Sequence, residues 1–515
     1  MSSAGDVSAP TTTKARFGAA FIAATALIAF GAWVRFVGLG TIEFWADEAD
    51  WAIRAEMGTG TFIRPLGYLW LAQQLVDLHN SELMLRLPSF VAGVVQLPLF
   101  FLLLKRLVVP SIAVMATAVL AVHPVAVGMS KEFKPYALEA CLHTALLLLV
   151  VALMASPTRR AVVALGAFAA AAPLLSWSIV FAYPGAFLVT GLQSLWQRRR
   201  TDFVVVVAGA GCAVVVLGLL FWARLQSADR KASYWGSKYG VFFNDNDVVG
   251  HLQWLAKKTA DLAAQAGELD VVLPWLTPLL QGGAQLLCVV GIVTLLRRRR
   301  WWVLLLLLLP LVTTVAFNVA RQWPYGPFRT NLYLLSYLIV LAAVGADGVV
   351  QLGEQLRRGA GRVLVAVAVV VGIVALPWKP LRLARKGNRN QTAQASVREA
   401  MNLLRAAETA APTAGAKPIL VLDGHACTLF RYYRDHHARS AELRDWFLEH
   451  VDDRCSGQGR KRWYPFLDKV NGQEFWLISA QGSLSKRTLK LLHERCRVTQ
   501  QVKLRGTFLL HCGKL

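Results

Sequence analysis

The feature of this sequence that most constrains its fold is a long series of hydrophobic runs separated by short charged segments. With a window of about 19 residues, the series predicts about eleven membrane-spanning helices. They are expected near residues 17–39, 87–104, 111–129, 136–155, 161–176, 178–195, 203–222, 273–296, 302–318, 332–350 and 363–378. With 55% hydrophobic and 17% charged residues, the chain is too apolar for a soluble enzyme of 515 residues. We therefore expect a polytopic α-helical membrane protein.

The basic residues predict how these helices are oriented. The formal net charge is +24, but Lys and Arg gather in short blocks between the runs, which is typical of membrane topology and not of nucleic-acid binding. If the runs on either side of Trp177 are two helices, the blocks share one side, which is the cytoplasm. A single broken helix there would invert everything that follows. The blocks are Lys14 and Arg16, Lys105-Arg106, Arg159-Arg160, Arg198 to Arg200, Arg297 to Arg300, and Arg357-Arg358 with Arg362.

This orientation places the N-terminus in the cytoplasm and the loop of residues 40–86 outside. The first run, residues 17–39, is longer than the core of a signal peptide and lacks a small-residue cleavage site, so we expect it to remain as a helix. The loops of residues 223–272 and 321–331 and the C-terminal region also face outward.

Three carboxylates, Asp47, Glu48 and Asp50, follow the first hydrophobic run directly. Ionised carboxylates beside a bilayer lose hydration, and such a cost usually marks a functional site. Other interpretations stay open. The segment is equally consistent with a solvated acidic loop, Asp47 and Glu48 are also suited to capping a following helix, and Asp50 has the helical i,i+4 spacing for an ion pair with Arg54.

Three further segments converge on the same outer face. Residues 60–79 are aromatic and apolar but too interrupted to span, which suits an interfacial helix carrying Arg64 and Tyr68. The segment 130–136 connects two spans, and the segment 321–331 precedes another. Their candidate residues are Lys131, Glu132, Lys134, Tyr136 and Arg329. The two lysines are also typical of snorkelling residues at a helix end.

Carboxylates and cations together at a membrane surface indicate a nucleophile to be deprotonated and a phosphate to be held. A sugar carried on a polyprenyl phosphate fits this combination. A carboxylate takes the proton of an acceptor hydroxyl, the hydroxyl attacks the anomeric carbon, and the lipid phosphate leaves. Phosphate is a good leaving group at neutral pH, so fixed cations replace a general acid.

Residues 381–515 differ in composition from residues 1–380, and we expect a separate α/β domain outside the cytoplasm. Continuous apolar runs at 418–422 and 474–479 predict buried strands, and helices are expected near 395–410 and 484–494. A hairpin is expected around residues 505–506. The region has 24 basic and 12 acidic residues, which favours contact with anionic lipid or glycan phosphate.

Four of the seven cysteines lie in this polar region. The hairpin brings Cys496 near Cys512 and leaves Cys427 and Cys455 as the other pair, so two disulfides are expected outside the cytoplasm. No Cys/His spacing indicates a zinc site.

Four segments resemble glycosyltransferase family 39, integral membrane enzymes of the GT-C fold class that include protein O-mannosyltransferases and the lipid A aminoarabinose transferase. The segments are Phe44-Trp45-x-Asp47-Glu48-Ala49, Arg64-Pro65-Leu66-x-Tyr68, Leu85-Arg86-Leu87-Pro88-Ser89 and Glu132-x-Lys134-Pro135-Tyr136-Ala137-Leu138. The resemblance covers residues 17–210 most closely and the later spans by layout. Many relatives have His-Pro-Pro where this chain has Arg64-Pro65-Leu66, so the chain departs from the family pattern at this helix.

The resemblance implies an inverting enzyme that uses a polyprenyl-phosphate sugar. It implies Asp47 as catalytic base with Glu48 beside it, and Lys131, Lys134 and Arg329 as phosphate ligands. Glu132 and Tyr136 would line the pocket, and Arg64 and Tyr68 would add contacts from the interfacial helix. Most members of the family need no metal, although Asp47 and Asp50 are suited to a divalent cation (Mg²⁺ or Mn²⁺), as in the oligosaccharyltransferase branch of the fold class.

Two other classes of function compete with this interpretation. A transporter or flippase of lipid-linked glycans would show charged residues near mid-membrane and an internal repeat, which the sequence does not clearly display. A non-catalytic cell-envelope scaffold would be favoured by loss of the acids, and the acids are present. The expected partners are the lipid-linked donor, a glycan, lipid or protein acceptor, and the bilayer. The expected location is a bacterial plasma membrane, since the sequence carries no endoplasmic-reticulum retention signal.

Overall fold

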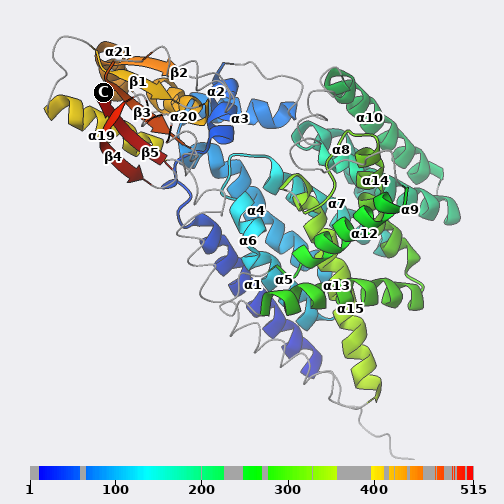
Figure 1. Ribbon diagram of the computed structural model, residues 1–515. Helices are drawn as coiled ribbons and strands as arrows, with labels where there is room; N and C mark the ends of the chain where they lie inside the picture. Colours follow the sequence, from blue (N-terminus) through cyan, green and yellow to red (C-terminus); the bar gives the residue numbers. More distant parts are fainter. Residues whose placement is uncertain are drawn as a thin grey trace, which may run out of the picture.

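The structure is a computed structural model that describes most of the chain. The described residues are 11–57, 65–198, 200–225, 248–268, 276–327, 329–356, 396–410, 417–422, 424–437, 441–455, 470, 473–480, 490, 492, 494, 496–504 and 507–513. Within them, a bundle of apolar helices carries a smaller α/β domain at one end (Figure 1). The expected domain boundary at residues 380 and 381 lies outside the described residues.

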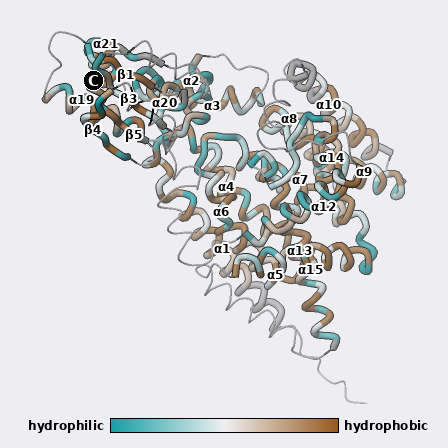
Figure 2. Tube along the Cα trace, in the orientation of Figure 1, coloured by the Kyte–Doolittle hydropathy of each residue, from teal (hydrophilic) through white to brown (hydrophobic). Residues whose placement is uncertain are grey.

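The helices of the bundle follow the hydrophobic runs of the sequence, except for α12 (Val248–Gln265), which lies in the segment expected to be a loop between two spans. They are α1 (Thr11–Phe36), α4 (Glu82–Leu104), α5 (Pro110–Val122), α6 (Pro124–Met129), α7 (Tyr136–Ala155), α8 (Arg159–Leu175), α9 (Tyr183–Trp196), α10 (Arg200–Leu225), α12 (Val248–Gln265), α13 (Leu276–Arg297), α14 (Trp301–Val319) and α15 (Leu332–Leu356). Figure 2 shows hydrophobic residues along these helices and a more mixed pattern in the α/β domain.

Ten of the expected spans coincide with helices, and the eleventh, 363–378, lies outside the described residues. Five described helices are long and apolar enough to cross a membrane, namely Glu82–Leu104, Tyr136–Ala155, Leu276–Arg297, Trp301–Val319 and Arg329–Gln355. The chain breaks between α8 and α9 at the short 3-10 helix η1 (Ser178–Phe181), so these are two helices as expected. The third span is divided into α5 and α6 at His123-Pro124, because proline cannot continue the helical hydrogen bonding.

Glycine allows the tightest helix contact of the bundle. A Cβ added to Gly345 of α15 would collide with the Leu287 carbonyl of α13, and one added to Gly291 would collide with the Leu341 carbonyl. Because only glycine permits such an approach of two backbones, α13 and α15 pack closely along their middle parts. The 3-10 turn η2 (Arg329–Asn331) directly precedes α15 and carries Arg329.

Two short helices lie in the connection between α1 and α4, namely α2 (Ala46–Glu56) and α3 (Leu66–His79). The first carries the acid cluster. The second confirms a helix over residues 66–79 of the segment 60–79, with Trp70 and Leu78 exposed, and its place at the membrane surface stays a prediction. Gly67 at its start lies against the Leu174 carbonyl at the end of α8.

The C-terminal region forms the expected α/β domain around a five-stranded mixed sheet in the order β2-β1-β3-β5-β4. Strands β2 and β3 pair with β1 in parallel, and β5 pairs antiparallel with β3 and β4. Its elements are α19 (Val397–Ala410), β1 (Ile419–Leu422), α20 (Gly424–Arg431), the π-helical turn η3 (Tyr432–His436), α21 (Ala441–His450), β2 (Asp452–Cys455), β3 (Phe475–Ser479), β4 (Arg497–Leu504) and β5 (Thr507–Gly513). The helix expected at 484–494 lies largely outside the described residues.

The predicted disulfide between Cys496 and Cys512 is not formed in the structure. Both thiols are free and buried, and a side-chain hydrogen bond joins them. Cys512 pairs with Val498, so Cys496 is its diagonal neighbour across the hairpin. Cys427 is disulfide-bonded, and the side chain of Cys455 lies outside the described residues.

Candidate active site at the first turn of helix α2

Helix α2 presents the acid cluster at its first turn. Trp45, with extended backbone angles of φ −94° and ψ 166°, precedes the helix, and its N–H donates to Glu48 Oε2 at 3.3 Å. Asp47 and Glu48 therefore lie at the positive end of the helix dipole, where carboxylates are favoured. The alternative expected from the sequence, that one of the acids caps a following helix, is confirmed for Glu48.

Asp47 lies between two cations that come from distant parts of the chain. Arg329 Nη2 donates to Asp47 Oδ2 at 2.9 Å, and Lys134 Nζ lies 3.9 Å from the same oxygen. Lys134 Nζ also donates to the Asp47 carbonyl at 3.1 Å. The Asp47 side chain is 46% exposed and that of Lys134 only 4%, so the carboxylate is accessible to a reactant while the cations are fixed around it.

Aromatic rings hold both cations. Lys134 Nζ lies 4.6 Å from the centre of the Trp51 ring, and Arg329 Cζ lies 4.6 Å from that of Trp45. Arg329 Cζ is also 5.9 Å from the ring of Tyr136. A cation over an aromatic face is attracted to it, and the flat rings restrict its movement. Trp45 and Trp51, on either side of Asp47, therefore fix the positions of the two cations that could bind an anion.

The charges around Asp47 decide its protonation. Burial by itself raises the pKa of the Asp47 carboxyl, but Lys134 and Arg329 outweigh burial and hold this pKa below its usual range. His425, an exposed residue of α20 in the C-terminal domain, acts in the same direction. Asp47 is consequently ionised at neutral pH and able to accept a proton.

Glu48 lies on the other side of the turn, and its side chain is 0% exposed. Arg86 donates to both of its oxygens, Nε at 3.0 Å and Nη2 at 2.9 Å, and the N–H of Phe133 donates to Oε1 at 2.6 Å. With these donors around both oxygens, Glu48 has no access to an acceptor. This geometry suits Glu48 to holding α2 in place, and its predicted role in catalysis stays a prediction.

Arg86 of α4 is the residue that sequence reasoning missed. It is fully buried, and besides Glu48 its guanidinium donates to the carbonyls of Leu39, Ile42 and Glu43. One arginine therefore ties the chain entering α2 to the start of a membrane-spanning helix. The Leu85-to-Ser89 motif contained it, but the motif indicated only the opening of a span.

Lys131 is placed differently from Lys134. It is buried, and its Nζ donates to the Val37 carbonyl at 2.7 Å, just beyond the end of α1. Burial first, and then the charges of Arg35 and Arg86, lower the pKa of Lys131 to about 7. The contact with Val37 is one that stabilises the end of a helix, and the role of Lys131 as a phosphate ligand remains a prediction.

The remaining predicted residues surround the site to different degrees. Tyr136 opens α7 beneath Arg329, and the buried Glu132 interacts electrostatically with Arg329. Tyr68 is buried, with its ring 6.0 Å from that of Phe133 and 5.7 Å from that of Trp51. It supports the aromatic wall behind Lys134. Arg64 lies outside the described residues.

Asp50 points to a separate ion pair. Its two oxygens accept from Arg54 Nε at 2.9 Å and 3.0 Å, as the i,i+4 spacing predicted. Among the residues that the structure describes, no group of three or more His, Cys, Asp or Glu is arranged to hold a metal ion. The donors that surround Asp47 are cations, which match a phosphate and do not fit a divalent metal.

Comparisons with known proteins identify the fold of the chain. The sequence model of the dolichyl-phosphate-mannose-protein mannosyltransferase family matches residues 63–222. The structure of ArnT from Cupriavidus metallidurans bound to undecaprenyl phosphate is similar to this chain, with a TM-score of 0.52 at 14% identity over 95% of this chain and 97% of ArnT. Apo ArnT has a TM-score of 0.50 with the same identity and coverage. No curated protein matches the chain in sequence.

Two independent likenesses thus meet on this chain, a sequence match over the segment that follows the acid cluster and a structural match over nearly its whole length. The C-terminal domain is included in the structural match, because 95% of the chain is covered. The chain is therefore a multi-pass membrane protein with the GT-C fold of membrane glycosyltransferases.

Proposed function

We propose that this protein is an inverting glycosyltransferase that moves a sugar from a polyprenyl-phosphate donor to an acceptor hydroxyl, with Asp47 as general base. The observation that carries the proposal is the half-exposed Asp47 carboxylate between Lys134 and Arg329. The similar ArnT structure holds undecaprenyl phosphate, and the matching family model is described by a dolichyl-phosphate sugar. Both support a lipid phosphate as the donor's carrier.

In this proposal the acceptor hydroxyl gives its proton to Asp47 as its oxygen forms a bond to the anomeric carbon. The bond between that carbon and the phosphate oxygen breaks, and its electron pair leaves with the lipid phosphate. Lys134 and Arg329 stabilise the charge that develops on the phosphate, so no acid is required. A single displacement of this kind inverts the anomeric configuration.

The ion pair between Arg329 and Asp47 suggests how donor binding activates the base. At 2.9 Å the guanidinium stabilises the ionised carboxylate and weakens it as a proton acceptor. A donor phosphate would compete for the same guanidinium and draw part of its charge away from Asp47. The base would then become stronger only when the donor is present.

The surroundings of Asp47 favour a metal-independent reaction in our proposal. Asp50 is paired with Arg54, and Asp47 faces two cations, so the two acids do not form the oxygen-rich site that Mg²⁺ or Mn²⁺ prefers. We place the protein in a bacterial plasma membrane, with its N-terminus in the cytoplasm and the site and C-terminal domain outside. The acceptor is a glycan, lipid or protein hydroxyl.

The test is transfer from a panel of radiolabelled polyprenyl-phosphate sugars into a membrane extract. Asp47→Asn is expected to lower the rate by about 10²- to 10⁴-fold, the usual contribution of a general base. Asp50→Asn is the matched control, because it makes the same chemical change on the same helix at an acid paired with Arg54, and it should transfer like the wild type.

Equal rates for wild type and Asp47→Asn would contradict the role of Asp47. Absence of transfer from every donor, with the protein folded and inserted, would contradict the glycosyltransferase proposal. It would favour a transporter of lipid-linked glycans or a scaffold.

A further inference from the structure

The connection between α1 and α4, which contains α2 and α3, shares one hydrophobic core with the C-terminal domain. Phe44, Ala49 and Tyr68 of this connection belong to the same buried cluster as Val397 of α19 and Phe430 of α20. Figure 1 accordingly shows the C-terminal domain seated beside α2. The domain is thus docked on the helix that carries Asp47. Its contacts reach residues directly before this helix.

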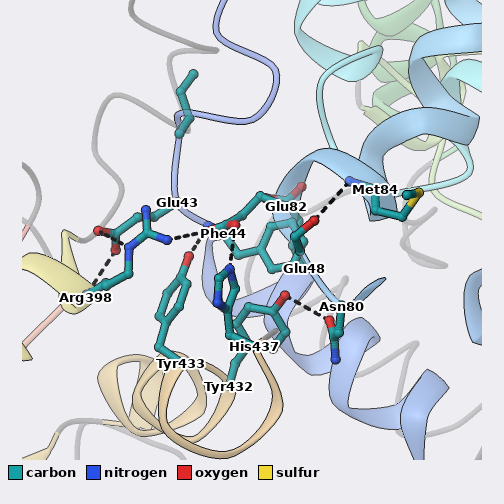
Figure 3. A network of polar contacts seen from close by, with 12 residues as sticks. Glu43, Phe44, Glu48, Asn80, Glu82, Met84, Arg398, Tyr432, Tyr433 and His437 are labelled. Atoms are coloured by element: carbon teal, nitrogen blue, oxygen red, sulfur yellow. Dashed lines mark hydrogen bonds and ion pairs between the residues drawn. The ribbon is translucent and has the colours of Figure 1, made fainter. Parts of the chain in front are cut away.

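One contact of the domain reaches the backbone just before α2. The N–H of Phe44 donates to the Tyr433 hydroxyl at 2.7 Å in a buried position (Figure 3). Phe44 lies three residues before Asp47, and its ring is 5.0 Å from that of Tyr432. A buried backbone N–H needs a partner, so Tyr433 fixes the extended segment that leads into α2.

The neighbouring residue, Glu43, makes a second contact. Its Oε2 accepts from the N–H of Arg398 at 3.1 Å, in the first turn of α19. The carboxylate of one domain thus satisfies a helix N-terminus of the other, where negative charge is favoured. The Arg398 side chain also lies near, with Nε at 3.8 Å from Glu43 Oε1.

The domain is anchored a second time, at the start of α4. His437 Nε2 lies 2.9 Å from Glu82 Oε2, and Arg398 Nη1 donates to Glu82 Oε1 at 3.2 Å. Tyr432 donates to Asn80 Oδ1 at 3.0 Å. Figure 3 shows these side chains converging from the two domains. Two residues of this anchor also contact residues 43–47, because Arg398 bonds to Glu43 and the Tyr432 ring packs against that of Phe44. The Tyr432 hydroxyl, in contrast, is bonded to Asn80 and not to this segment.

Residues 43 and 44 are therefore bonded both to the helix bundle and to the C-terminal domain. Arg86 of α4 donates to the Glu43 carbonyl at 3.2 Å. In the C-terminal domain, the Arg398 N–H donates to the Glu43 carboxylate and the Tyr433 hydroxyl accepts from the Phe44 N–H. Glu48, four residues on from Phe44, is fixed by the same arginine. Asp47 lies between these fixed points.

We propose that the C-terminal domain positions the general base, and that Tyr433 is the positioning residue that does so through Phe44. This inference rests on the proposed function for its catalytic part. A displacement of about 1 Å at a reacting group lowers rates by up to about 10²-fold, so the docked domain is required for efficient transfer.

The experiment compares Tyr433→Phe with Tyr432→Phe. Each removes one buried hydroxyl from adjacent residues of the same interface and keeps the ring. Only the first removes the partner of the Phe44 N–H, because the Tyr432 hydroxyl is bonded to Asn80. Amide hydrogen exchange across residues 39–48 is measured in both variants, together with kcat and KM for the donor.

Tyr433→Phe is expected to speed exchange in residues 39–48 by about tenfold and to lower kcat by a similar factor, with little change in the donor KM. Tyr432→Phe should leave both close to wild type. Equal exchange in the two variants overturns the positioning role, whether or not transfer is detected. Faster exchange in Tyr433→Phe with unchanged kcat overturns its importance for the reaction. A wild type without transfer contradicts the proposed function alone, since the exchange comparison stands by itself.

Discussion

The two sides of the first turn of α2 use the same chemistry for opposite purposes. On one side, Asp47 faces Lys134 and Arg329 and is 46% exposed. On the other, the Glu48 side chain is 0% exposed and paired with Arg86, of which 1% is exposed. Adjacent carboxylates, each beside a cation, thus differ mainly in their access to water and to a ligand.

Access decides which of the two pairs can be exchanged for a substrate. Removing one partner of a buried pair leaves the other charge without solvent, which is strongly unfavourable. A half-exposed pair is compensated by water or by an incoming phosphate at little cost. The structure therefore separates a replaceable charge at Asp47 from an irreplaceable one at Glu48, although the sequence places them side by side.

The largest effect expected from this contrast is on folding. Glu48→Ala leaves Arg86 buried without its carboxylate and should lower the free energy of unfolding by about 3–5 kcal/mol. Asp47→Ala should change it by less than about 1 kcal/mol. Thermal unfolding of the purified protein in detergent checks both. Similar stability of the two variants would show that burial does not distinguish the carboxylates.

The contrast also shows what the sequence could predict. Hydropathy is a local property, and the spans and the α/β domain could be predicted from it. The acid cluster was evident from three carboxylates directly after the first hydrophobic run. The topology then placed Asp47, Lys134 and Arg329 on one face, although Arg329 is 282 residues from Asp47. The three charged groups meet as that topology predicted.

What could not be predicted depends on contacts that sequence does not encode locally. Lys131 and Lys134 lie in the same segment, 130–136, yet one bonds to the Val37 carbonyl and the other lies over the Trp51 ring. Arg86 opens a hydrophobic span, and only the fold shows that it holds Glu48. Nor does any motif indicate that Tyr433 reaches Phe44, because that contact joins residues 389 apart.

Glu43 is intermediate in exposure between Glu48 and Asp47, with 15% of its side chain exposed. Its burial is expected to make the stability of the protein depend on pH. Burial raises the pKa of the Glu43 carboxyl from 4.5 to about 7, against the opposing effect of Arg398. Folding therefore takes up a proton between these pH values, so the free energy of unfolding falls as pH rises from about 5 to 8. The contribution is on the order of 3 kcal/mol at most.

Glu43→Gln should remove this part of the pH dependence, because the amide does not titrate. Unfolding temperatures of wild type and variant at pH 5.5 and pH 8 measure it, with Asp50→Asn as a control that keeps Glu43. A wild type that becomes more stable as pH rises, by an amount that Glu43→Gln abolishes, would reverse the assigned direction of the pKa.

Asp50 provides the smallest expected effect on stability. Its pair with Arg54 is exposed on both sides, at 36% and 40%, and pairs of this kind contribute about 0.3–0.5 kcal/mol on a helix. Asp50→Asn should therefore change the free energy of unfolding by no more than this, and high salt should reduce the difference further. Stability measured at low and high salt tests both points. A loss of several kcal/mol would mean that exposure does not govern these carboxylates, and Glu48 and Asp47 would then need another explanation for their different surroundings. If the loss is small, the acids from Glu43 to Asp50 form a graded series in which burial sets the cost of removing a charge and access sets its use in chemistry.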